Sequence, residues 1–111
     1  MAVRRKSDTV PAKNKKIMPP VHPGEVLRDI LSEASLSANE VALSLRVPAN
    51  RLTAILNGKR AITADTALRL GRYLGTSAAM WMNLQSKYDL QVAEDELREK
   101  IEREVIPRPA A

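Results

Sequence analysis

The sequence contains no cysteine, and this absence excludes several kinds of chemistry. Disulfide bridges, thiol nucleophiles and cysteine-ligated zinc sites all require a thiol. Phenylalanine is also absent, and only Trp81, Tyr73 and Tyr88 supply aromatic rings, so we expect aliphatic side chains to form most of the core. A chain of 111 residues has room for one small domain with terminal extensions.

Long hydrophobic segments are missing as well. No apolar run approaches the roughly 20 residues of a membrane-spanning helix. The basic N-terminus is not followed by the hydrophobic segment of a signal peptide. We therefore expect a cytoplasmic protein that does not associate with membranes.

Motifs for catalysis or cofactor binding are equally scarce. His22 is the only histidine, and its position before Pro23 at an expected helix start suits capping better than catalysis. The sequence has no glycine-rich phosphate loop, metal-ligand cluster or nucleophile motif. It predicts a protein that is not an enzyme, has no small-molecule substrate and uses no cofactor or metal.

Charge is segregated along the chain. Residues 1–18 contain six cations against Asp8, and residues 46–72 contain six cations against Asp65. From residue 89 onward, seven acids face four cations. We interpret residues 1–18 as a flexible basic arm, whose scattered cations either follow a nucleic-acid backbone or form a plain solvated extension.

Residues 37–57 are predicted to form two short helices joined by a tight turn. Ser37 and Glu40 have the spacing of a capping box, in which each side chain bonds to the other's backbone amide, so a helix starts there. Pro48 suits the first position of the next helix and disfavours helical geometry in the residue before it. Two helices arranged in this way predict a helix-turn-helix, whose second helix enters the major groove of DNA.

The residues expected to contact DNA fall into two sets. Asparagine can pair with adenine, arginine with guanine, and a methyl group can contact thymine. We predict base contacts from Ala49, Asn50, Arg51 and Thr53. Cations and other donors around the turn and the helix ends suit the phosphate backbone. We predict phosphate contacts from Ser37, Asn39, Arg46, Asn57, Lys59 and Arg60. The alternative is a helical hairpin with a solvated charged face.

Five expected helices with short connections and no convincing strand indicate an all-α domain. Thr63 and Ser77 are expected to cap the last two helices. We expect the arm at residues 1–18, the DNA-binding domain at 19–93, and an acidic helical extension and tail at 94–111.

The last and longest helix carries more apolar surface than a four-helix core requires. This surface either packs into the core of the domain or forms a two-fold dimer interface, and the sequence leaves both alternatives. A dimer would present two reading helices about one DNA turn apart, roughly 34 Å, and would therefore require a palindromic operator. The dimer interface is predicted at Met80, Trp81, Leu84 and Tyr88.

Residues 36–60 resemble the helix-turn-helix of the phage-repressor-like (XRE) family, which implies a lambda-repressor-like fold. Two flanking sequence motifs, His22–Leu27 (HPGEVL) and Met80–Leu90 (MWMNLQSKYDL), make the resemblance more specific, to the HigA antitoxins. The resemblance covers about residues 20–93. It implies a homodimer that represses its own operon and neutralises a HigB-like toxin, a RelE-type ribosome-dependent ribonuclease. The alternatives are a stand-alone XRE-family regulator without a toxin partner and an interaction module that does not bind DNA.

Two residues depart from the family pattern. Arg46 occupies a turn position where the family usually has glycine, because the backbone there is commonly left-handed. Either Arg46 tolerates that conformation or the turn differs. Ala38 replaces a glutamine that contacts phosphate in many members, so this contact cannot form here.

Overall fold

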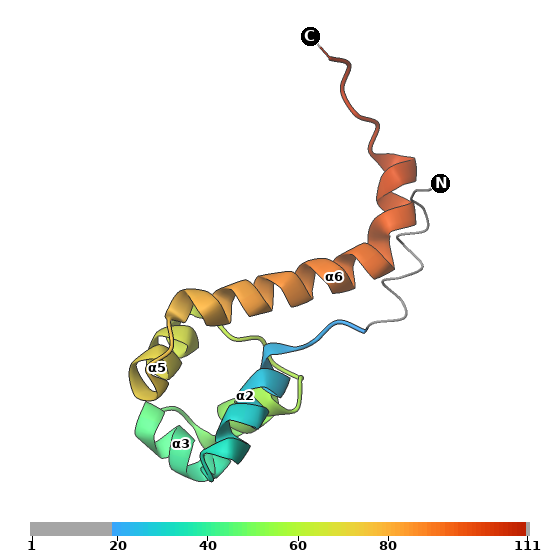
Figure 1. The fold of residues 1–111 in the computed structure, drawn as a ribbon. Coiled ribbons are helices and arrows are strands. Elements are labelled where there is room, and N and C mark those ends of the chain that lie inside the picture. The colour runs from blue at the N-terminus through green and yellow to red at the C-terminus, as the bar shows by residue number, and fades with distance from the viewer. Residues whose placement is uncertain (1–18, 111) are drawn as a thin grey trace, which may run out of the picture. The chain divides into compact units, whose positions relative to one another are not determined.

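The computed structural model describes residues 19–110, and within them it contains α-helices and no β-strand. The elements, shown in Figure 1, are α2 (Pro23–Glu33), α3 (Ala38–Leu45), α4 (Ala49–Leu56), α5 (Ala64–Leu74) and α6 (Ala78–Glu104). The predicted all-α fold with five helices is confirmed. The predicted arm at residues 1–18 lies outside the described residues.

Side-chain caps set the starts of the helices. The Ser37 hydroxyl accepts a hydrogen bond from the Glu40 amide at 3.1 Å, and the Glu40 carboxylate accepts one from the Ser37 amide at 2.9 Å. His22 caps α2, because its Nδ1 accepts from the Gly24 amide at 2.8 Å. Thr63 and Ser77 also accept from amides in the first turns of α5 and α6. The predicted capping residues therefore all act as caps.

The backbone around the turn differs in detail from the sequence-based expectation. Pro48 is the residue before α4 and not its first residue; it has an extended conformation (φ −61°, ψ 142°), and the helix begins at Ala49. Arg46 takes the left-handed conformation that the family pattern implies (φ 61°, ψ 44°). At the end of α4, Gly58 alone is left-handed, with φ +73°, while Asn57 has φ −89°.

The core of the domain is almost entirely aliphatic, as its composition predicts. α4 packs against α2 and α3, and α3 also packs against α5. Gly24 allows α2 to lie directly on α4, because a Cβ at this position would collide with the carbonyl of Ile55. The core consists of Leu27, Leu31, Val41, Ala42, Leu45, Val47, Leu52, Ile55, Ile62, Ala67, Leu70 and Trp81.

Trp81 is the one ring in this core, and its side chain is 0% exposed. Its indole Nε1 donates to the Thr76 hydroxyl at 2.8 Å, which satisfies the polar atom inside the protein. A fully buried side chain has no surface left for a second protomer. The structure therefore corrects the prediction that Trp81 lies in a dimer interface and makes it a core residue.

The last helix runs without interruption from Ala78 to Glu104. Residues 21–88 form one compact unit, and residues 89–110 belong to another. The expected domain boundary at residue 93 stays a prediction. None of the described helices is long and apolar enough to cross a membrane.

Candidate nucleic-acid interface

The outer face of α4 carries the four residues predicted to read bases. Ala49, Asn50 and Thr53 are exposed, and Arg51 is half-buried. Leu52 and Ile55 of the same helix are buried in the core. The helix therefore fixes one face in the protein and leaves small and polar side chains on the other.

Arg51 forms an ion pair with the first turn of α5. Its Nη1 lies 3.1 Å from Oδ2 of Asp65, and Oδ1 of Asp65 lies 3.0 Å from Nε of Arg69. Nη1 of Arg69 in turn donates to the carbonyl of Leu45 at 2.9 Å. These four residues, which we call the Asp65 bridge, connect the end of α3 to the outer face of α4 through α5.

The bridge keeps its central carboxylate charged. The hydrogen bond from Arg69 is the main cause that lowers the pKa of Asp65 below the usual aspartate value, and Arg51 lowers it further. Partial desolvation acts in the opposite direction but does not outweigh the two guanidinium groups. Asp65 therefore remains an anion inside a basic part of the chain.

The predicted phosphate contacts lie around the two ends of the helix-turn-helix. Ser37 and Asn39 are exposed at the start of α3, and Lys59 and Arg60 are exposed after α4. The Ser37 oxygen already accepts from the Glu40 amide, but its hydroxyl hydrogen can still donate to phosphate. These positions are compatible with backbone contacts on both sides of α4.

Asn57 is hydrogen-bonded by Arg28, a residue that the sequence analysis did not predict to belong to the site. Arg28 of α2 donates to the Asn57 side-chain oxygen at 2.8 Å and to the Leu56 carbonyl at 3.0 Å. The second bond satisfies one of the carbonyls that every helix end leaves unpaired. Arg28 therefore both caps α4 and orients a predicted phosphate contact.

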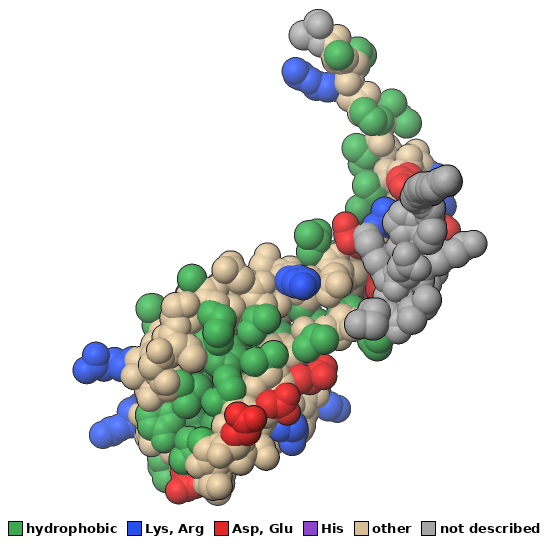
Figure 2. Space-filling model, viewed as in Figure 1, with side chains coloured by type: hydrophobic (Ala, Val, Ile, Leu, Met, Phe, Trp, Pro, Cys, Tyr) green, Lys and Arg blue, Asp and Glu red, His purple; other side chains and the backbone are tan. Residues whose placement is uncertain are grey.

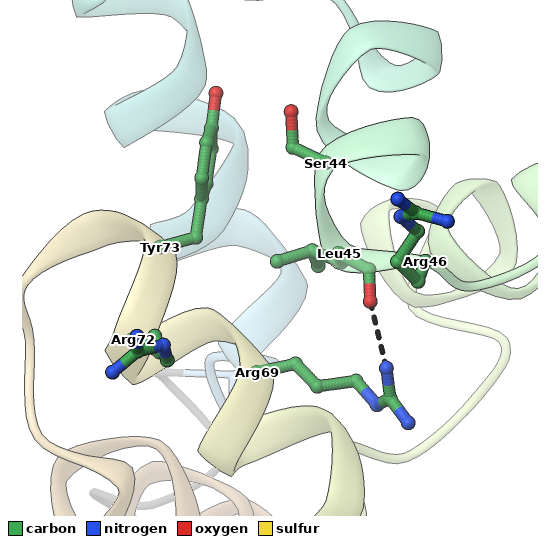
Figure 3. Close-up of a pocket in the computed structure, with 6 residues that line it drawn as sticks. All are labelled: Ser44, Leu45, Arg46, Arg69, Arg72 and Tyr73. Carbon is green, nitrogen blue, oxygen red and sulfur yellow. Dashed lines mark hydrogen bonds between the residues drawn. The ribbon is translucent and has the colours of Figure 1, made fainter.

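Arg46 lines a pocket between the end of α3 and α5 (Figure 3). The pocket has a volume of about 420 Å³ and includes Arg69 and Arg72 of α5. Figure 3 shows these cations around Leu45, with the ring of Tyr73 and the Ser44 hydroxyl on its other side; the full lining is Ser44, Leu45, Arg46, Arg69, Arg72 and Tyr73. The pocket is suited to an anionic group.

Charge is separated over the surface of the helical domain. In Figure 2, a row of acidic side chains lies over α2 with a basic side chain beside it, and further basic side chains project from the edge that α3 and α5 form. In the described part of the chain, no group of three or more histidine, aspartate or glutamate side chains is arranged to hold a metal ion.

Three of the residues predicted for a dimer interface retain accessible surface. Met80 and Leu84 are half-buried against the core. The Tyr88 ring is also half-buried and packs edge-on against His22, with ring centroids 4.8 Å apart. Their role in a dimer stays a prediction.

Comparison of the sequence and structure with those of known proteins identifies the family of this chain. The helix-turn-helix family matches residues 27–81. Virulence-associated protein I of Dichelobacter nodosus is 47% identical over 89 residues, which cover 79% of this chain and 82% of that protein. A HigA-family antidote protein from Coxiella burnetii is 50% identical in sequence, with a TM-score of 0.76 over 82% of this chain and all of that one.

Pseudomonas aeruginosa antitoxin HigA, solved with the higBA promoter, is 46% identical, with a TM-score of 0.78 over 81% of this chain and 99% of that one. The matched family is one of helix-turn-helix DNA-binding regulators and antitoxins and not of enzymes, in agreement with the sequence-based expectation. The chain belongs to the XRE-type helix-turn-helix family that includes the HigA antitoxins.

Proposed function

We propose that this protein is a HigA-type antitoxin that binds a palindromic operator as a homodimer and represses its own operon. The observation that carries the DNA-binding part is the outer face of α4, where Ala49, Asn50 and Thr53 are exposed and Arg51 is half-buried. This face lies within residues 46–72, where six cations face one acid. Base readers surrounded by phosphate-binding cations are what sequence-specific binding requires.

A titration with the gene's own promoter tests this proposal. We expect tight binding to a promoter fragment and much weaker binding to a scrambled fragment of equal length. Both affinities should fall steeply with salt, because cations released from DNA drive the non-specific part of binding. Equal affinity for both fragments at every salt concentration would overturn sequence-specific recognition.

We also propose that the protein neutralises a HigB-like toxin. Support comes from relatives: the Coxiella protein is described as an addiction module antidote, and Antitoxin HigA-1 of Vibrio cholerae is 31% identical over 72 residues. The test is co-expression with the product of the gene that lies next to this one. Growth arrest by the neighbour alone and recovery on co-expression support the antitoxin, whereas a harmless neighbour favours a stand-alone regulator.

A further inference from the structure

We propose that Asp65 is a positioning residue for DNA recognition, which fixes the Arg51 guanidinium for base reading and reduces binding to non-specific DNA. This inference rests on the proposed DNA-binding function. Asp65 is the only acid among residues 46–72, and a carboxylate beside a phosphate backbone opposes binding. We therefore expect Asp65 to make a favourable contribution to DNA recognition that offsets this repulsion.

The contacts of Asp65 supply such a role. Each of its two oxygens faces a different arginine, Arg51 at 3.1 Å and Arg69 at 3.0 Å. Arg69 is itself anchored to the Leu45 carbonyl at the end of α3. Asp65 is thus fixed by Arg69, which is itself bound to the end of α3. The ion pair with Asp65 in turn restricts the position of the Arg51 guanidinium on α4.

Arg51 depends on this one partner. Its Nε is buried and has no hydrogen-bond acceptor, and within residues 19–110 Asp65 is the only side chain that binds its guanidinium. Arginine has five N–H donors, so one bond to Asp65 leaves donors for the two acceptors of a guanine edge. A side chain ordered before binding loses less conformational entropy when the complex forms.

The charge of Asp65 has a second consequence. On a non-specific sequence, Arg51 finds no matching base, and Asp65 adds only repulsion from the phosphates. On the operator, the ordered guanidinium gains its base contact and offsets that repulsion. Asp65 therefore raises the ratio of specific to non-specific affinity.

The test measures both affinities for Asp65→Asn, with Asp29→Asn as a control. Asp29 is an exposed acid on α2 that has no hydrogen-bond or ion-pair partner in the described residues, so the control makes the same charge change outside the bridge. For Asp65→Asn we expect operator affinity to fall about tenfold, since one good arginine–guanine pair is worth about that factor or more. Non-specific affinity should rise slightly.

A double-mutant cycle identifies the route of the effect. In an Arg51→Ala background, Asp65→Asn should leave the specificity ratio unchanged, because the residue that Asp65 positions is gone. If Asp65→Asn fails to fold, Asp65→Glu retains the charge and moves the carboxylate by one methylene. It should then lower operator affinity without raising non-specific affinity.

Three results overturn the proposal. A parallel rise of both affinities would make Asp65 a simple repulsive charge, and a rise at the operator alone would make it a competitor for Arg51. An unchanged ratio in Asp65→Asn would leave it a purely structural bridge. Absence of operator binding by the unmodified protein would instead reject the proposed function itself, so the two failures are distinguishable.

Discussion

Arg28 donates a hydrogen bond to the side-chain oxygen of Asn57 at 2.8 Å, across 29 positions of sequence. An arginine can only donate, so the atom that faces it must be the amide oxygen of Asn57. The Asn57 NH₂ group then remains available as a donor at the end of α4. This arrangement gives the predicted phosphate contact a defined orientation.

The first prediction concerns this pair. Asn57→Asp keeps an acceptor for Arg28 but replaces the donor with a negative charge, so DNA affinity should fall for all sequences alike while thermal stability is retained. Fluorescence anisotropy with operator and scrambled DNA measures the first effect, and thermal denaturation measures the second. A loss confined to the operator would assign Asn57 to base reading instead.

Arg51→Ala should weaken specific operator binding by about 1 to 3 kcal/mol and leave weak non-specific binding largely intact. The matched control is Arg72→Ala, which removes an exposed cation of α5 outside the reading face. This control should weaken both kinds of binding equally or not at all. An unchanged operator titration for Arg51→Ala removes this residue from the reading set.

Trp81→Ala should lower the free energy of unfolding by about 3 to 5 kcal/mol, because it empties a fully buried ring site in the core. Urea denaturation followed by circular dichroism measures the change. Leu68→Ala is the control, since Leu68 is 65% exposed and its truncation should have little effect. Equal stability of both variants would contradict the central position of Trp81.

Arg46→Gly should stabilise the protein by roughly 1 kcal/mol, because glycine adopts the left-handed conformation at φ 61° without steric cost. Arg46→Ala removes the same charge but keeps a side chain at this backbone, so it should give no such gain. Denaturant midpoints of the two variants provide the comparison. A gain of equal size in both would attribute the effect to charge and not to the backbone.

The Asp65 bridge predicts a pH dependence. The pKa of Asp65 is lowered in the folded state, chiefly by the hydrogen bond from Arg69. The ionised carboxylate therefore stabilises the fold at pH values above the ordinary aspartate pKa. This stabilisation is lost as the pH falls through the lowered pKa of the folded state. The stability difference between the unmodified protein and Asp65→Asn should therefore be constant from about pH 7 to pH 5, begin to decrease near the ordinary aspartate pKa of about 4, and be lost only below the lowered pKa. Denaturation at a series of pH values measures this difference. A difference that grows on acidification would contradict the ion pair.

Local sequence signals were sufficient for the helices and their caps. The Ser37 and Glu40 capping box depends on residues three positions apart, and the left-handed Arg46 follows from the family pattern. The start of α4 was displaced by one residue, because proline is equally compatible with the last extended residue before a helix.

Contacts between distant residues could not be read from the sequence. Arg51 and Asp65 are 14 positions apart, and only the packing of α3, α4 and α5 brings them together. The lone acid in the basic block was a visible signal, but it did not identify a partner. Trp81 shows the same limit, since an apolar residue on a long helix suits a core and an interface equally until its burial is known.

The most direct test of the central claim is a nuclease footprint of the purified protein on its own promoter. Sequence-specific binding by a two-fold dimer predicts protection of one palindromic site, with half-sites about one DNA turn apart, roughly 34 Å. The Arg51→Ala variant should lose that protection at the same protein concentration. Protection of no promoter segment, even at low salt, would contradict the claim that α4 reads an operator.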